Sequence, residues 1–130
     1  MTKQEALISQ FEKTVGNLRE VLVKLEKEKK DRAVFRDSAI QRFEIAFDVC
    51  WKTLKEKLRD EYGVDSASPK KTFQEAFKQA IIDNEPIWLE MTDMRNETSH
   101  TYNEELAVSV LKRLPSACDA LEKLLWKLKK

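Results

Sequence analysis

The stretch from Ser38 to Leu58 reads SAIQRFEIAFDVCWKTLKEKL, and it decides the fold class. Its apolar side chains recur every three or four residues, which is the spacing of one face of an α-helix. That face holds Ile40, Phe43, Phe47, Cys50, Trp51, Leu54 and Leu58. Ser38 and Gln41 have capping-box spacing, so we expect this helix to begin near Ser38 or a few residues earlier. Gly63 is well placed to end it in the left-handed conformation that other residues avoid.

Two more long helices flank this stretch. The first is predicted from about Thr2 to about Glu28, where apolar residues again fall on one stripe. The last is predicted to begin near Thr101, because Thr101 and Glu104 have capping-box spacing. Pro115 lies inside the last helix, and a proline removes a hydrogen bond there, so we expect a kink.

Two short helices complete the pattern. Ser68 before Pro69 indicates an N-cap and a first-turn proline, and Asn84 with Pro86 marks a second start. No alternating apolar and polar run is bounded by hairpin turns, so strands are not expected. Three long and two short helices predict an all-α, up-and-down bundle of the four-helix type. At 130 residues the length fits one domain over residues 1–130.

Bulk charge gives no sign of a polyanion-binding or membrane-bound protein. The chain has 24 Lys and Arg against 23 Asp and Glu, so its total charge does not favour nucleic acid or membrane. No apolar run approaches the about 20 residues that span a bilayer. The charged N-terminal segment does not resemble a signal peptide. We therefore expect a cytoplasmic protein with no membrane association.

The cysteine and histidine content argues against a metal site. Cys50 and Cys118 both fall within apolar helical patterns and are predicted to be buried free thiols. There is no Cys-x-x-Cys pair, and a single histidine does not make a zinc site with partners this scattered. We expect no metal ion and no cofactor.

Candidate chemistry gathers between Asp83 and Glu105. This segment holds the only histidine, His100, five residues after Arg95. Five residues turn an ideal helix by about 500°, which leaves the two side chains about 140° apart. Within one regular helix they would therefore not converge on a small group. They can converge if the helix ends between them or if a second copy supplies the other half of a cleft.

Arg95 and His100 are a minimal pair for cutting a phosphodiester. A guanidinium holds a phosphate with paired hydrogen bonds and stabilises its developing charge. An imidazole exchanges protons near neutral pH. RNA supplies its own nucleophile, the 2′-hydroxyl, so no metal is needed. Asn96 is a candidate for orienting His100 or binding a phosphate oxygen, and Asp93 and Ser99 are candidates for supporting the site.

An ordinary structural role fits the same residues. A histidine near a helix C-terminus is stabilised by the helix dipole, and Arg95 can pair with Asp93 or Glu97 in a surface network. The segment also holds seven acidic residues and one basic residue, Arg95. RNA binding needs positive surface, which has to come from elsewhere. The candidates are Lys24, Lys27, Lys29, Lys30, Arg32 and Arg36, or Lys70, Lys71 and Lys78.

The octapeptide RNETSHTY, Arg95 to Tyr102, resembles the signature of the HEPN family: Arg, a polar residue, three variable positions, His, one residue and Tyr. The stretch from Ser38 to Leu58 is similar to the branch called nucleotidyltransferase substrate-binding proteins. The stretch from Ser68 to Met91, SPKKTFQEAFKQAIIDNEPIWLEM, shares that similarity. The resemblance extends over nearly the whole chain.

The resemblance implies a HEPN-like helical bundle that forms a homodimer around a shared cleft, and a complex with a minimal nucleotidyltransferase. In toxin members the signature Arg and His carry metal-independent ribonuclease activity, which would fall on Arg95 and His100. The partner neutralises such toxins by transferring AMP to the signature tyrosine, here Tyr102. The alternative is a non-catalytic subunit that binds a substrate or nucleotide and presents it to the nucleotidyltransferase.

Overall fold

A computed structural model describes all residues from Met1 to Lys130 and contains only helices. The helices are α1 (Lys3–Lys27), α2 (Arg32–Tyr62), α3 (Pro69–Lys78), α4 (Glu85–Glu97) and α5 (Glu104–Lys129), with a 3-10 turn, η1 (Thr98–His100), before α5. The predicted set of three long and two short helices, with no strand, is confirmed.

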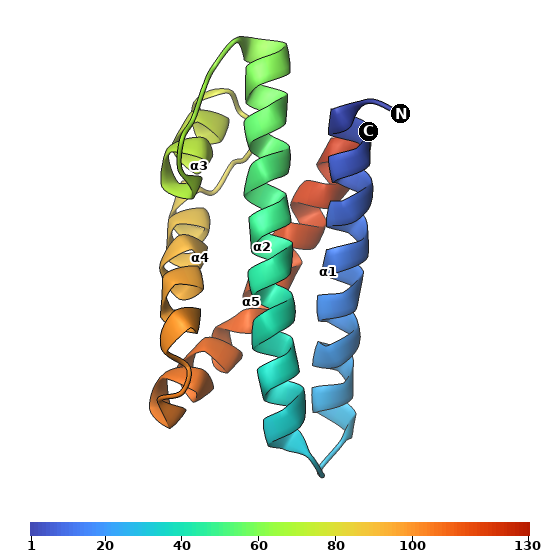
Figure 1. The fold of residues 1–130 in the computed structure, drawn as a ribbon, viewed down its shortest axis with the longest axis vertical. Helices are drawn as coiled ribbons and strands as arrows, with labels where there is room; N and C mark the ends of the chain where they lie inside the picture. The colour runs from blue at the N-terminus through green and yellow to red at the C-terminus, as the bar shows by residue number, and fades with distance from the viewer.

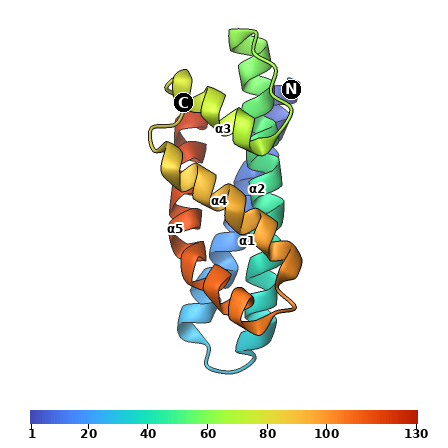
Figure 2. The ribbon, with the colours of Figure 1, turned by 90° about the vertical axis from the view of Figure 1, so that its left-hand side faces the viewer.

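The helices fill four packing positions. Figure 1 shows α2 at the centre with α1 beside it as an antiparallel hairpin, and α3 and α4 on the other side. Helix α5 runs behind α1 and α2 (Figure 1), and Figure 2 shows α3 lying across the upper part of the bundle with α4 running obliquely below it. The two chain termini lie at one end of the bundle, and the α1–α2 connection lies at the other (Figure 1).

All five α-helices contribute to one core of 28 buried apolar residues. A run of aromatic rings passes through it from α2 to α4. The ring centroids of Phe43 and Phe47 are 5.9 Å apart, those of Phe47 and Phe73 are 5.6 Å apart, and those of Phe73 and Trp88 are 5.1 Å apart. The short helices are therefore fixed to α2 by large apolar side chains, whose burial contributes about 1.5–3 kcal/mol each.

Several helix ends lie where the sequence places them. The Thr2 hydroxyl accepts a hydrogen bond from the Glu5 amide at 3.1 Å and caps α1. Gly63 ends α2 in the left-handed conformation, with φ 67°. The Ser68 hydroxyl accepts a hydrogen bond from the Lys71 amide at 3.3 Å and caps α3.

The start of α2 is earlier than its sequence signal. The helix begins at Arg32, so Ser38 is an internal residue and not its N-cap. Arg32, the first residue of α2, makes a contact that the local pattern does not contain. The Arg32 guanidinium donates to the carbonyls of Leu25 and Glu28, at 2.5 and 3.0 Å. It thereby satisfies two carbonyls at the open C-terminal end of α1.

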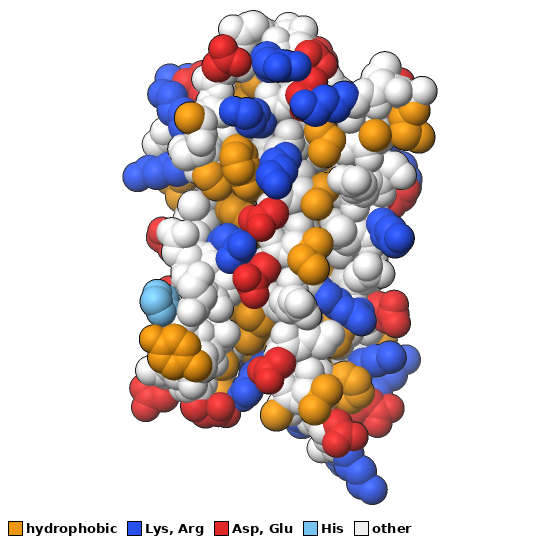
Figure 3. All heavy atoms as spheres, viewed as in Figure 1, with side chains coloured by type: hydrophobic (Ala, Val, Ile, Leu, Met, Phe, Trp, Pro, Cys, Tyr) orange, Lys and Arg blue, Asp and Glu red, His pale blue; other side chains and the backbone are white.

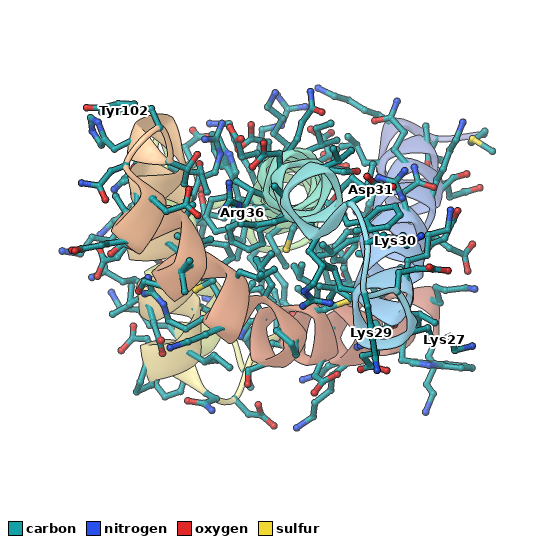
Figure 4. The ribbon with its side chains drawn as sticks, turned by 90° about the horizontal axis from the view of Figure 1, so that it is seen from below. Lys27, Lys29, Lys30, Asp31, Arg36 and Tyr102 are labelled. Atoms are coloured by element: carbon teal, nitrogen blue, oxygen red, sulfur yellow. The ribbon has the colours of Figure 1, made fainter.

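The start of α5 is later than predicted. The helix begins at Glu104, and its N-cap is Asn103, whose side-chain oxygen accepts a hydrogen bond from the Leu106 amide at 3.1 Å. The Thr101 hydroxyl, which the capping-box spacing assigns to α5, donates to the preceding 3-10 turn instead. Helix α5 continues through Pro115. Figures 2 and 4 show its first turns inclined to the rest, which is the bend expected of an internal proline.

Both cysteines are buried and free, as predicted. Burial raises the pKa of the Cys118 thiol to about 12 and also raises the pKa of Cys50. Both therefore stay protonated at neutral pH. None of the helices combines the length and the apolar character that crossing a membrane requires.

Candidate functional site

The signature residues span the last turn of α4, which holds Arg95 and Asn96, and the connection between α4 and α5, which we call the α4–α5 turn (residues 98–103). Helix α4 ends at Glu97, between Arg95 and His100, as expected. The Thr98 hydroxyl donates to the Arg95 carbonyl at 2.6 Å, and the Thr101 hydroxyl donates to the Thr98 carbonyl at 3.1 Å. These bonds satisfy carbonyls at the end of α4, so the turn has a defined shape.

His100 and Tyr102 lie together at the surface of this turn. The Tyr102 hydroxyl oxygen is 3.4 Å from Nδ1 of His100, and the rings meet edge to face with centroids 6.0 Å apart. Tyr102 is 86% exposed. The pale-blue histidine projects at the edge of the molecule in Figure 3, and Tyr102 lies at the outer edge of the bundle in the view of Figure 4. Both polar atoms are therefore open to a partner or a substrate.

Arg95 points the other way, into a carboxylate cluster on α2. Its Nε and Nη2 donate to the two oxygens of Asp48, both at 3.1 Å. Its Nη1 donates to Glu44 at 3.0 Å and to the Thr98 hydroxyl at 3.1 Å. The fork to Asp48, ahead of the charge of Glu44, raises the pKa of the Arg95 guanidinium. One N–H of the five that an arginine carries stays free for another ligand.

No hydrogen bond joins Arg95 to His100. The predicted pairing of Arg95 with Asp93 or Glu97 is wrong, because Glu97 pairs with Arg113 and Asp93 is exposed without an ion pair. The reason is tertiary: the two α2 carboxylates reach Arg95 from a helix that lies 47 to 51 residues away in sequence. Asn96 and Ser99 are exposed, and neither side chain makes a hydrogen bond within the chain.

Two further arginines form ion pairs with acidic residues on either side of the α4–α5 turn. Arg36 of α2 donates to Glu104 at the start of α5 at 2.6 Å, and Arg113 of α5 bonds Glu97 at the end of α4. The pairing with Glu104 raises the pKa of the Arg36 guanidinium. Glu97 and Glu104 belong to the acidic segment, so part of its negative charge is balanced by arginines from other helices.

Glu44 and Asp48 are the site residues that sequence reasoning missed. They stand four residues apart on α2, beside the buried aromatic face that contains Phe43 and Phe47. Two acids at that spacing share one helix face, and their position at the border of a buried face indicates a partly buried cationic partner. Nothing in the local sequence identifies that partner as Arg95.

Two cavities lie beside α5, and the larger, of about 430 Å³, opens between α4 and α5. The smaller is the more apolar. It has a volume of about 260 Å³ and opens between the α3–α4 connection and α5. Ile82, Ile87, Trp88 and Leu124 form its apolar wall, and Lys123 and Lys127 stand at its rim. None of the signature residues lines it. No three His, Cys, Asp or Glu side chains come together in a way that would hold a metal ion.

Comparison with known proteins connects this architecture to one family. The family model described as "Nucleotidyltransferase substrate binding protein like" matches residues 6–130. A crystal structure of a protein from Thermus thermophilus is similar at 36% identity and a TM-score of 0.83, over 92% of this chain and 99% of that one.

Two Haemophilus influenzae proteins are also similar. One is a solved structure described as the fold of a substrate binding domain of a nucleotidyltransferase. It has a TM-score of 0.84 over 95% of this chain and 99% of that one, and at 24% identity it supports the fold alone. The other is "Probable ribonuclease HepT", 36% identical over 76 residues, which are 55% of this chain and 52% of that protein. The match spans about half the length of this relative.

Proposed function

This chain belongs to the nucleotidyltransferase substrate-binding family, and on that premise we propose that it is the toxin ribonuclease of a toxin–antitoxin pair. Arg95 and His100 would cut RNA without a metal ion, and a nucleotidyltransferase would silence the protein by transferring AMP to Tyr102. The observation that carries this proposal is the exposed His100–Tyr102 pair, with 3.4 Å between Nδ1 and the hydroxyl oxygen. The similarity to a probable ribonuclease supports it.

The cleavage step follows from the chemistry of RNA and imidazole. The 2′-hydroxyl attacks the adjacent phosphorus, the P–O5′ bond breaks, and a cyclic phosphate and a free 5′-hydroxyl are formed. His100 exchanges the proton that leaves the nucleophile or joins the leaving oxygen, a role worth about 10²–10⁴-fold in rate. Arg95 stabilises the charge on the phosphate, and Asn96 binds a phosphate oxygen or orients His100.

The silencing step uses the same corner of the molecule. The Tyr102 oxygen attacks the α-phosphorus of ATP, pyrophosphate leaves, and the phenolic proton passes to a base. The product is a phosphodiester on Tyr102 beside His100. Its negative charge and bulk would occupy the space that a substrate phosphate needs, so modification of Tyr102 would block the chemistry of His100.

We also propose that the protein acts as a homodimer. Arg95 faces α2 while His100 faces outward with Tyr102, so one copy does not direct both side chains at a single phosphate. Two copies meeting at the α4–α5 turn would bring Arg95 and His100 from both chains into one cleft. Sedimentation at micromolar concentration should give a dimer mass; a monomer alone would remove this part of the proposal.

A non-catalytic subunit that binds a substrate or nucleotide for its nucleotidyltransferase is the second candidate. The observation that favours it is the Arg95 cluster, in which four of the five N–H groups are already occupied. The bonds to Asp48 account for two of them, and Glu44 and Thr98 for the others. A cluster with two carboxylates and one guanidinium repels a phosphate. The cavity beside Trp88 offers such a subunit a place for a small ligand.

Cleavage assays on the purified protein separate the two candidates. The unmodified protein should cut RNA in the presence of EDTA, and His100→Ala should lower the rate about 10²–10⁴-fold. Glu105→Ala is the control, since Glu105 lies exposed in the first turn of α5 without an ion pair. Undiminished cleavage by His100→Ala would remove the assignment. No cleavage by the unmodified protein, together with stable binding to the nucleotidyltransferase, would favour the second candidate.

A further inference from the structure

A ribonuclease of this fold needs positive surface that its signature residues do not supply. Arg95 is the one basic residue between Asp83 and Glu105, and Glu44 and Asp48 neutralise it. The phosphate backbone dominates the affinity of proteins for nucleic acids. The RNA must therefore be held by cations elsewhere on the molecule.

Two groups of lysines are available, and their ion pairs distinguish them. On α3, Lys71 and Lys78 both pair with Glu75, each at 3.4 Å. At the α1–α2 connection, Lys27, Lys29 and Lys30 are exposed, and none of the three forms an ion pair or a side-chain hydrogen bond. We call these three lysines the basic tip. The three tip lysines therefore have no partner within the chain, whereas on α3 Lys71 and Lys78 share the carboxylate of Glu75 and only Lys70 is unpaired.

The local charge of the tip differs from that of the whole chain. Residues 27–36 contain five basic and two acidic residues, a formal charge of +3, whereas the whole chain carries +1. The remainder of the molecule is therefore slightly negative. The first turn of α2, which follows directly, contains no acidic residue. The two acids of this stretch, Glu28 and Asp31, lie in the connection itself, and neither forms an ion pair with a tip lysine.

The basic tip lies at the same end of the bundle as the α4–α5 turn. Figure 1 shows the α1–α2 connection and the start of α5 together at the lower end, while α3 is at the upper end. Figure 4, which views that lower end, shows Arg36 between Tyr102 on one side and Lys29 and Lys30 on the other. Arg36 also bonds Glu104 at 2.6 Å. One end surface therefore runs from the tip lysines, past Arg36, to His100 and Tyr102.

We propose that the basic tip binds the phosphate backbone of the RNA whose cleavage site lies at His100. This inference rests on the proposed function and names the surface by which that function holds its substrate. Free lysine ammonium groups bind phosphates as point charges without reading sequence. The tip therefore contributes affinity and places the strand across the end of the bundle, and the α4–α5 turn acts on it.

The test measures RNA binding by fluorescence anisotropy against salt concentration. The parent is the full chain with His100→Ala, so that RNA stays intact. The tip variant adds Lys27→Gln, Lys29→Gln and Lys30→Gln, and its matched control adds Lys70→Gln, Lys71→Gln and Lys78→Gln on α3. Both remove three positive charges from exposed positions. Circular dichroism and thermal midpoints establish that each variant is folded.

The tip variant should bind single-stranded RNA about tenfold or more weakly at moderate salt, and its salt slope should fall by about two, at about 0.7 for each contact. The α3 control should change neither value by a comparable amount. Equal weakening in both variants, or undiminished binding by the tip variant, would overturn the proposal. So would normal RNA binding together with loss of binding to the nucleotidyltransferase, which would assign the tip to a protein partner.

Cleavage in the His100 form distinguishes this inference from the proposed function. Suppose that the tip variant loses RNA binding and that the protein with His100 intact cuts no RNA. The basic tip is then a polyanion-binding surface, and the ribonuclease assignment fails. If the protein cuts RNA at the same rate and KM with and without the tip lysines, the ribonuclease assignment stands and the tip proposal fails.

Discussion

At the scale of single residues, the state of Arg95 governs what the site can do. Its guanidinium binds Asp48 through a fork and Glu44 through a single bond, with 27% of its side chain exposed. This pairing orients the planar group and leaves one N–H for a ligand. A phosphate that approaches Arg95 finds only one N–H group free to donate to it. Arg95 therefore contributes to cleavage only if the phosphate can reach that N–H beside Asp48.

The fork gives a prediction for Arg95→Lys. A lysine keeps the charge but cannot make the paired bonds to Asp48. We expect the free energy of unfolding to fall by about 1 kcal/mol, since the pair is partly exposed, and cleavage to fall about 10²–10³-fold. Urea denaturation and a cleavage assay measure the two effects.

Arg113→Lys is the matched control, because Arg113 also pairs with a carboxylate and has 29% of its side chain exposed. It should lose similar stability and keep its cleavage rate. Cleavage at the normal rate by Arg95→Lys, or equal loss in both variants, would show that Arg95 acts through structure alone.

The residues of the signature were predictable from the sequence, and their bonding partners were not. Arg95, His100 and Tyr102 stand within eight consecutive residues, so a local pattern identifies them. Glu44 and Asp48 reach Arg95 only because α2 packs beside the end of α4. Such a pairing depends on tertiary packing, and nothing within a single helix specifies it.

At the scale of helices, the helix ends show where prediction from the sequence succeeds and where it fails. Helices α1 and α3 begin at capping residues that the sequence identifies, because Thr2 and Ser68 accept bonds from amides three residues later. Ser38 and Thr101 show the same spacing and do not cap. Ser38 lies well inside α2, where the amides are already bonded within the helix, and at the start of α5 Asn103 is the cap while Thr101 donates to the α4–α5 turn. Capping patterns therefore predicted helix existence better than helix boundaries.

The two left-handed helix ends give a paired prediction. Ala80 follows α3 with φ 58°, and the Ala80 and Ile81 amides donate to Phe77 and Ala76 at 3.0 and 2.9 Å, the pattern of a Schellman end. A side chain is strained in this conformation, so Ala80→Gly should raise the free energy of unfolding by about 0.5–1 kcal/mol.

Gly63→Ala is the opposite change at the end of α2. An added Cβ there meets nothing within 4 Å, so its cost is conformational. We expect a loss of about 1 kcal/mol. Thermal or urea unfolding of both variants measures the pair. A destabilised Ala80→Gly protein would mean that Ala80 contributes packing that outweighs its backbone strain.

At the scale of the whole molecule, positive and negative charges nearly cancel, but positive charge is concentrated at the basic tip. The fold class, the helix count and the aromatic core follow from periodicity in the sequence, because those signals repeat over many turns. The gathering of the basic tip and the α4–α5 turn at one end of the bundle does not, because it depends on how α5 crosses α1 and α2 (Figure 1).

The charge pairs also set how stability depends on pH. A hydrogen bond from Lys57 lowers the pKa of Glu61 below its usual 4.5. Burial of Glu56 would raise its pKa, but Lys3 and Arg59 together lower it. A carboxyl group with a lowered pKa contributes stability above its unfolded-state value, and this is lost as pH falls through the folded-state value.

Stability should therefore stay level near neutral pH and decrease below about pH 4.5. Urea midpoints at a series of pH values measure this. Lys57→Ala should lose less stability on acidification than the natural sequence, since Glu61 then has no cation to lower its pKa. An unchanged midpoint down to about pH 3 would contradict the role given to these pairs.

The proposed function depends most on Tyr102 as the acceptor of AMP beside His100. The measurement is the intact mass of the protein co-expressed with its nucleotidyltransferase, for the natural sequence and for Tyr102→Phe, with peptide mapping over residues 96–106. We predict that the natural sequence gains one or more AMP units at Tyr102 and that Tyr102→Phe gains none. An unmodified natural protein that still binds its partner, or equal modification of Tyr102→Phe, would contradict the account.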